Sequence, residues 1–129
     1  MGVFNGLFGS KEPKAPKPEI PWQHLREISQ LDKIANDSKA KPVAIYKHST
    51  TCGISRMVLR QIESTYDIDA TQMDIYYLDL KAYREVSNEV AARFQVIHQS
   101  PQMIVIKNGT AVYADSHGAV NVPVLHQYL

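Results

Sequence analysis

The chain has little cysteine and no excess of charge. Its 129 residues include a single cysteine, so an internal disulfide cannot form. Secreted proteins of this size more often carry paired cysteines, and the lone thiol therefore favours a reducing cytoplasm. Fourteen lysines and arginines face thirteen aspartates and glutamates, which leaves a formal net charge of +1. This balance gives no electrostatic basis for binding nucleic acid.

Long hydrophobic runs are also missing, which argues against a signal peptide or a transmembrane segment. Residues 1–9 are apolar, and residues 10–21 hold four prolines and three lysines, as in an extended linker. We therefore predict a tail and linker over residues 1–21 and one folded domain over residues 22–129. The tail is either free or docked on this or a neighbouring subunit, and the second alternative includes a homodimer.

Within the predicted domain, strand-like and helix-like patterns alternate. Apolar runs predict three strands, over residues 42–48, 73–80 and 102–107. Apolar residues at helical spacing predict four helices, one carrying Leu31, Ile34 and Ala35 and the others over residues 53–66, 83–94 and 122–128. Ser29 and Asn121 are the predicted N-caps of the first and last helices. Trp22 and Leu25 fit either a short first strand or an irregular entry.

The hairpin signal Asn108-Gly109 predicts that the chain returns as a strand over residues 110–115. The resulting order is β-α-β-α-β-α-β-β-α, and successive strand and helix pairs favour parallel strands with right-handed crossovers. The predicted fold is α/β and thioredoxin-like. It has a central mixed sheet with parallel early strands and an antiparallel C-terminal hairpin, flanked by helices.

The single cysteine, Cys52, lies in a polar turn between the strand over residues 42–48 and the helix over residues 53–66. Unpaired amides and the helix dipole stabilise a thiolate at such a place, which makes Cys52 a candidate catalytic residue. The alternative is an inert core cysteine, but the neighbouring residues are polar rather than aliphatic.

Ser55 is the second candidate catalytic residue, because it stands where dithiol redox proteins place a resolving cysteine. A serine can hydrogen-bond the thiolate but cannot form a disulfide, so a second molecule must resolve any mixed disulfide at Cys52. His48 and Arg56 are candidates for electrostatic support of the thiolate. For Arg56, a solvated helix face is the simpler alternative.

Ser100 and Pro101 form a second candidate element, just before the predicted strand over residues 102–107. Proline is tolerated at the first residue of a strand. Where the bond before it is cis, the preceding backbone can pair with an extended substrate. Together with Thr51 and Gly53, these residues are the predicted substrate-binding set. The histidines at positions 24, 117 and 126 lack metal-ligand spacing, and no metal site is predicted.

These motifs resemble those of the monothiol bacilliredoxins of the YtxJ type, which have a thioredoxin fold. The resemblance covers roughly residues 22–129, and residues 47–55 are similar to the family's Thr-Cys-Pro-Ile-Ser motif with its leading residues. Further matches are Ser87-Asn88, His98-x-Ser100-Pro101-Gln102, Lys107-Asn108-Gly109 and Ser116-His117.

The resemblance implies removal of bacillithiol from S-bacillithiolated client proteins, or exchange of a similar small thiol. Cys52 would be the attacking and carrying sulfur, and Pro101 the cis-proline opposite it. Bacillithiol would act as a cosubstrate rather than a tightly bound cofactor, and its release would need a further reductant.

The sequence departs from the family motif at one position, because Gly53 replaces the proline. Cys52-Gly53-Ile54-Ser55 is thereby also similar to the Cys-Gly-Phe-Ser motif of monothiol glutaredoxins, which bind a bridging [2Fe-2S] cluster with glutathione. Against this alternative, residues 116–119 lack the Gly-Gly-x-Asp element of those glutaredoxins. A third alternative is a non-catalytic thioredoxin-like binding module.

Overall fold

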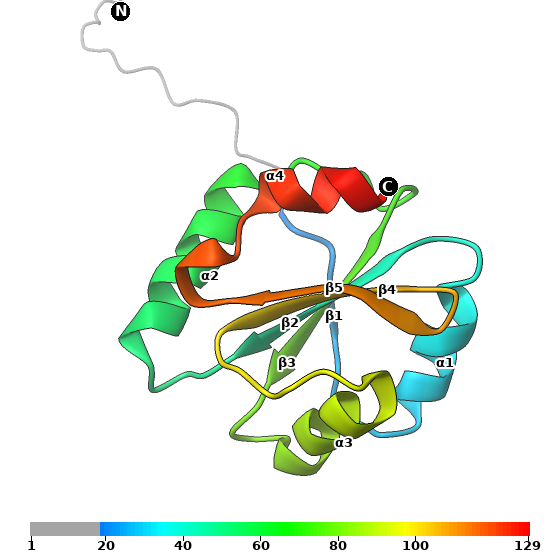
Figure 1. Cartoon of the computed structure of the whole chain (residues 1–129). Coiled ribbons are helices and arrows are strands. Elements are labelled where there is room, and N and C mark those ends of the chain that lie inside the picture. The colour runs from blue at the N-terminus through cyan, green and yellow to red at the C-terminus, as the bar shows by residue number, and fades with distance from the viewer. Residues whose placement is uncertain (1–18) are drawn as a thin grey trace, which may run out of the picture.

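The computed structural model describes residues 19–129, so the predicted tail and most of the predicted linker lie outside the described residues (Figure 1). The elements follow one another in the predicted order: β1 (Trp22–His24), α1 (Gln30–Asp37), β2 (Val43–His48), α2 (Gly53–Thr65), β3 (Asp74–Asp79), α3 (Arg84–Phe94), β4 (Gln102–Lys107), β5 (Thr110–Ser116), η2 (His117–Ala119), α4 (Val122–Leu125) and η3 (His126–Tyr128). No helix in this part of the chain is long and apolar enough to cross a membrane.

The five strands form one mixed sheet in the order β1-β3-β2-β4-β5. β1 and β2 both pair with β3 in parallel, whereas β4 runs antiparallel to β2 and β5 antiparallel to β4. This confirms the predicted fold class. The entry at Trp22 is a short strand, because Trp22 pairs with Ile75 in β3.

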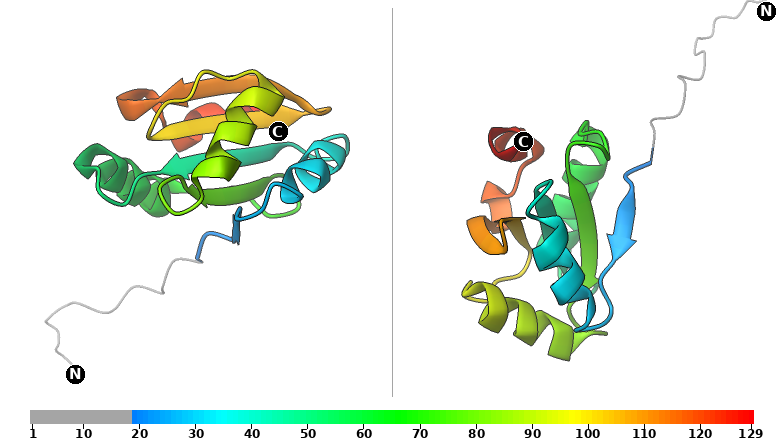
Figure 2. Two further views of the ribbon diagram at one scale, coloured as in Figure 1. Left: turned by 90° about the horizontal axis from the view of Figure 1, so that it is seen from below. Right: turned by 90° about the vertical axis from the view of Figure 1, so that its right-hand side faces the viewer.

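Helices cover both faces of the sheet, so all six residues of β2 are buried. α1 and α3 pack on one face, around a core that includes Val43 and Ile45. Seen from below, these two helices lie in front of the strands (Figure 2). The opposite core, which includes Ala44 and Tyr46, lies under α2 and α4. Alternate residues of β2 therefore point to opposite cores.

Ser29 is the N-cap residue of α1, as predicted, but only Asn121, the N-cap of α4, caps its helix through the side chain. The Ser29 side chain makes no capping hydrogen bond. Instead, Oε1 of Gln30 accepts from the backbone N–H groups of Arg26 and Glu27 at 2.7 and 2.9 Å and fixes the preceding turn. Oδ1 of Asn121 accepts from the N–H of Val124 at 3.1 Å.

The predicted hairpin is present, with Lys107 paired to Thr110 across Asn108 and Gly109. Both turn residues have positive φ, 53° and 75°, which is the backbone that Asn-Gly sequences favour in two-residue hairpins. The last predicted helix is shorter than expected, because α4 gives way to the 3-10 turn η3 at His126.

Candidate active site

Three segments converge at the carboxyl end of β2. The turn before α2 begins where β2 ends at His48. Lys47 pairs with Gln102, the first residue of β4, so the preceding Pro101 lies at the same end of the sheet. Gln102 also pairs with Ser116 at the end of β5, and the N–H of His117 donates to the carbonyl of Pro101 at 3.0 Å. The sheet register thus joins the turn, the proline loop and the start of η2.

Cys52 is the N-cap residue of α2, with an extended backbone (φ −103°, ψ 123°). Its N–H donates to the carbonyl of Ser49 at 3.2 Å, and its carbonyl accepts from the N–H of Arg56 at 3.2 Å. The side chain is partly exposed and forms no disulfide. This placement argues against an inert cysteine in the hydrophobic core.

Convergent donors lower the pKa of the Cys52 thiol below its ordinary value. The largest cause is hydrogen bonding from the backbone N–H of Ser55, which partial desolvation opposes. The Ile54 N–H and the Ser55 hydroxyl add to the lowering, and the Arg56 charge adds the smallest contribution. Arg56 is exposed on the surface of the helix, and its charge also favours the thiolate.

Ser55 is fully buried, and its hydrogen bonds stabilise the turn before α2. Its Oγ accepts from the N–H of Ser49 at 3.3 Å, and its carbonyl accepts from the Tyr46 hydroxyl at 3.1 Å. The residue at the resolving position thus stabilises both the loop and the thiolate. Since it carries no sulfur, it cannot displace a group from Cys52.

His48 is buried, and its ring contacts the rings of Tyr46 and Tyr77. Burial is the main cause that lowers the pKa of His48, and the Arg56 charge lowers it further while Asp79 opposes the shift. Near neutral pH, His48 is therefore mostly neutral and supplies little positive charge to the thiolate.

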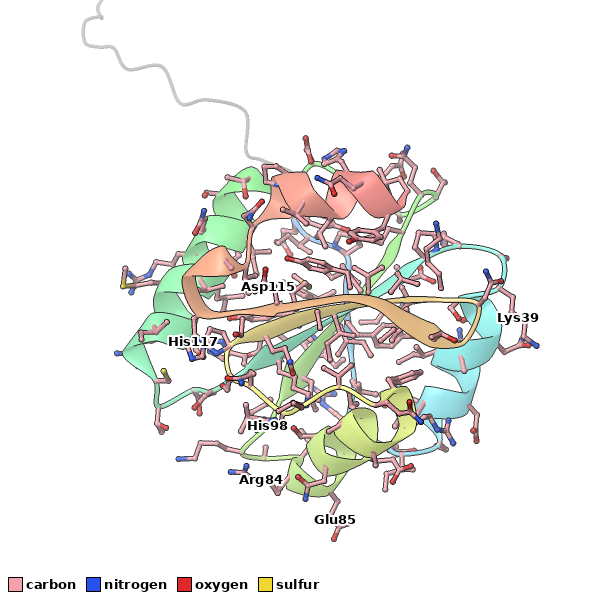
Figure 3. All side chains as sticks on the ribbon, in the orientation of Figure 1. Lys39, Arg84, Glu85, His98, Asp115 and His117 are labelled. Carbon is pink, nitrogen blue, oxygen red and sulfur yellow. The ribbon has the colours of Figure 1, made fainter. Side chains whose placement is uncertain are left out.

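The Ser100–Pro101 peptide bond is cis, as the resemblance implied. Pro101 is buried, whereas Ser100 is only partly so. The Ser100 Oγ is nevertheless a buried atom with no hydrogen-bond partner among the described residues. The loop that contains these two residues continues from His98, which lies between α3 and the sheet (Figure 3).

Gly53 and Thr51 flank the cysteine on the exposed side of the turn. An added Cβ at Gly53 would meet only Nη2 of Arg56, at 3.8 Å, which is an ordinary contact. The Thr51 hydroxyl accepts from Nζ of Lys81 at 3.2 Å. Sequence reasoning missed Lys81, because thirty residues separate it from Thr51.

Lys47 is a second residue that sequence reasoning missed. It is fully buried, and its Nζ donates to the carbonyl of Ser87 at 3.3 Å and contacts Nδ1 of His98 at 3.2 Å. Burial lowers the pKa of Lys47 to about 8. The sequence does contain a signal for this burial. Side chains alternate between the two faces along β2, and Lys47 lies on the same face as Val43 and Ile45, which belong to the core.

A family model described as monothiol bacilliredoxin BrxC matches residues 23–125. The chain belongs to this family. Solved structures agree on the fold. A proposed oxidoreductase with a thioredoxin fold is 34% identical, with a TM-score of 0.68 over 81% of this chain and 89% of the other.

Two thioredoxins show the same fold at lower identity. The Malassezia sympodialis protein is 19% identical, with a TM-score of 0.68 over 91% of this chain and 95% of the other. The Fasciola hepatica protein is 21% identical, with a TM-score of 0.61 over 82% and 94%. The family and the single thiol together assign this bacilliredoxin to monothiol thiol-disulfide redox chemistry.

Proposed function

We propose that this bacilliredoxin removes bacillithiol from S-bacillithiolated proteins through a mixed disulfide at Cys52. The observation that carries the proposal is a partly exposed sulfur whose pKa is lowered by convergent amides, with a serine in place of a resolving thiol. A reactive thiol of this kind needs a reducing compartment to remain available, and we therefore propose a cytoplasmic location.

In the first step, the Cys52 thiolate attacks the bacillithiol sulfur of the client's mixed disulfide. A bond forms between Cys52 and bacillithiol, the client's sulfur leaves as a thiolate, and it takes a proton from water. Because a sulfur of low pKa is both a good nucleophile near neutral pH and a good leaving group, Cys52 suits the transfer in both directions.

In the second step, the thiolate of a further small thiol or of a protein reductant attacks the bacillithiol sulfur held by Cys52. The Cys52 thiolate is released, and bacillithiol leaves in a disulfide with the attacking thiol. Ser55 cannot take this role, so the cycle depends on an external thiol as cosubstrate. The amides of Ile54 and Ser55 stabilise the departing Cys52 thiolate as they stabilise the resting one.

Mass spectrometry of the full chain mixed with an S-bacillithiolated model protein tests this function. We expect one bacillithiol adduct on Cys52, recovery of the client's free thiol in equal amount, and neither product with Cys52→Ser. Absence of the adduct under conditions that modify a free cysteine peptide would overturn the proposal.

The other two functions predict different results. Iron-sulfur carriage predicts a coloured dimer after anaerobic reconstitution with iron and sulfide. A binding module without redox activity predicts that the alkylation rate of Cys52 rises with a pH midpoint at or above the pKa of an ordinary cysteine. The lowered pKa of Cys52 favours thiol exchange over the binding module.

A further inference from the structure

Lys47 is a buried cation without an acidic partner. No other lysine or arginine among residues 19–129 is buried, and none of the ion pairs in this part of the chain includes Lys47. Taking an unpaired charge out of water is unfavourable, so lysine is rare in protein cores. Methionine would fill much of the same space without this penalty, so packing alone does not explain the lysine.

The Lys47 ammonium joins α3 to the loop that follows it. Nζ donates to the carbonyl of Ser87 in α3 at 3.3 Å, and it lies 3.2 Å from Nδ1 of His98. Because an ammonium can only donate, Nδ1 of His98 is the acceptor and the ring carries its proton on Nε2. Lys47 therefore binds His98 only while the imidazole is neutral.

His98 belongs to the proline loop, residues 95–101, which connects α3 to β4. The Gln102 side chain also binds this loop. Its Nε2 donates to the carbonyl of Ile97 at 2.9 Å, and its Oε1 accepts from the N–H of Gln99 at 3.4 Å. Three consecutive loop residues are thus fixed by side chains from the sheet, although all three are exposed.

Lys47 and Gln102 form one buried pair beneath the proline loop. They lie opposite each other in the β2–β4 pairing, and directly paired residues point to the same face of a sheet. Lys47 is 0% and Gln102 2% exposed. The loop that they bind ends in Ser100 and Pro101, which belong to the predicted substrate-binding set.

We propose that Lys47 and Gln102 are positioning residues that fix the proline loop for binding the polypeptide chain of the client. This inference rests on the proposed function, because it specifies how the client side of the same exchange is recognised. In this role, the loop backbone at Ser100 pairs with an extended client segment beside the modified cysteine. A small disulfide has no such segment and gains nothing from an ordered loop.

The charged groups that face His98 come from two elements, Lys47 in β2 and Arg84 at the start of α3 (Figure 3). Burial is the main cause that lowers the pKa of His98, and both of these charges lower it further. Below that pKa, Nδ1 of His98 carries a proton and cannot accept from Lys47. Recognition of the client chain should therefore weaken on acidification.

Two disulfides with the same bacillithiol half test the positioning role. In one, bacillithiol is joined to the central cysteine of a short uncharged peptide, and in the other it is joined to N-acetylcysteine amide. Rate constants for adduct formation at Cys52 are measured with both on the full chain. The readout is the peptide rate constant divided by the amide rate constant, in which the reactivity of the Cys52 thiolate cancels.

We expect the unmodified protein to prefer the peptide about tenfold, since backbone hydrogen bonds each contribute a few-fold. Lys47→Met and Gln102→Leu should each lower this ratio about threefold. Lys47→Met should do so without loss of stability in urea at pH 7, because methionine removes a buried charge. A merely structural lysine would not separate these two measurements.

His98 provides a second pair of variants at an exposed position, where substitution does not endanger folding. His98→Ala removes the acceptor and should lower the ratio about threefold. His98→Asn retains an acceptor near the place of Nδ1 and should keep the ratio. Acidification from pH 7 to 5 should lower the ratio in the unmodified protein but not in His98→Asn, whose amide does not titrate. An equal fall in both would overturn the inference.

Ile104→Val is the matched control, because it shortens a fully buried side chain of the same core without removing a hydrogen bond to the loop. It should leave the ratio unchanged. An equal fall in Ile104→Val and Lys47→Met would overturn the inference, as would an unchanged ratio in Lys47→Met or a ratio near one in the unmodified protein. In these cases, adduct formation at Cys52 would leave the proposed function standing. Failure of Cys52 to react with either disulfide would instead overturn that function.

Discussion

Cys52 and Lys47 lie five residues apart at one end of β2, yet their surroundings favour opposite charge states. Donors converge on the exposed sulfur and lower the pKa of the Cys52 thiol, which favours its charged form. Burial lowers the pKa of Lys47 to about 8, which disfavours its charged form. The site therefore stabilises the Cys52 thiolate on the α2 side of the sheet and destabilises the charged Lys47 amine on the α3 side.

Both shifts affect stability in the same direction. A group with a lowered pKa binds fewer protons in the folded chain than in the unfolded chain between the two pKa values. The free energy of unfolding therefore rises with pH across that interval. For Lys47 the interval runs from about 8 to 10.5, and for Cys52 it ends at 9.0.

The largest predicted effect is on the pH dependence of stability in Lys47→Met. One proton corresponds to at most about 1.4 kcal/mol per pH unit, so the unmodified chain should gain about 1 kcal/mol between pH 8 and 9.5. Lys47→Met should lose most of this gain, because the buried amine is gone. Urea unfolding at several pH values measures the slope. An unchanged slope in Lys47→Met would contradict the lowered pKa of Lys47. Lys39→Met removes an exposed lysine, so this control should keep the slope of the unmodified chain.

Ser55→Ala tests the other side of the comparison and should have the next largest effect. It leaves the Ser49 N–H without its acceptor and removes one donor to the thiolate. We expect a loss of about 1 kcal/mol in the free energy of unfolding and a higher pKa of the Cys52 thiol. The rate of iodoacetamide alkylation against pH measures the pKa.

Ser29→Ala is the control, because its exposed hydroxyl makes no capping hydrogen bond. It should change stability by less than about 0.5 kcal/mol and leave the alkylation midpoint in place. If Ser29→Ala and Ser55→Ala behave alike, the buried serine has no special part in holding the turn.

The cysteine turn could be predicted because its determinants are local. A buried strand, a polar turn and helical spacing occur together within residues 42–66, and the alternation of elements then gives the thioredoxin-like order. The hairpin was predictable for the same reason, since Asn108 and Gly109 themselves favour the required positive φ.

The lysine side of the site depends on contacts between distant segments. Lys47 contacts Ser87 and His98, forty and fifty-one residues away, and no local pattern specifies those partners. The missing side-chain cap at Ser29 has a local cause, because the N–H groups of Leu31 and Asp32 donate to the carbonyls of Ile28 and Ser29 instead. Propensity predicts which residue stands at the N-cap, but the geometry of the preceding turn decides whether its side chain is used.

Gly53→Pro should stabilise the turn without changing the thiol. Gly53 is the first residue of α2 and follows a residue in extended conformation, both of which suit proline. The amides that lower the thiol pKa belong to Ser55 and Ile54, so no thiolate donor is lost. We expect a gain of about 0.4–1 kcal/mol in urea unfolding and an unchanged alkylation midpoint.

Gly109→Ala provides the opposite case, because Gly109 has a φ of +75°. Alanine there should destabilise the chain by more than Gly53→Pro stabilises it. A raised alkylation midpoint in Gly53→Pro would show that the glycine backbone itself is needed to present the thiolate.

Arg56→Gln should have the smallest effect and separates long-range charge from direct hydrogen bonding. Arg56 is the last contributor to the lowered pKa of Cys52, after the Ser55 hydroxyl. The pKa should therefore rise less than in Ser55→Ala. In 1 M salt the Debye length is about 3 Å, so the difference in thiol pKa between Arg56→Gln and the unmodified chain should vanish. The difference between Ser55→Ala and the unmodified chain should persist.

Arg60→Gln, one turn further along α2, is the control and should match the unmodified chain at low and at high salt. A difference that survives high salt would mean that Arg56 acts by direct contact with the sulfur.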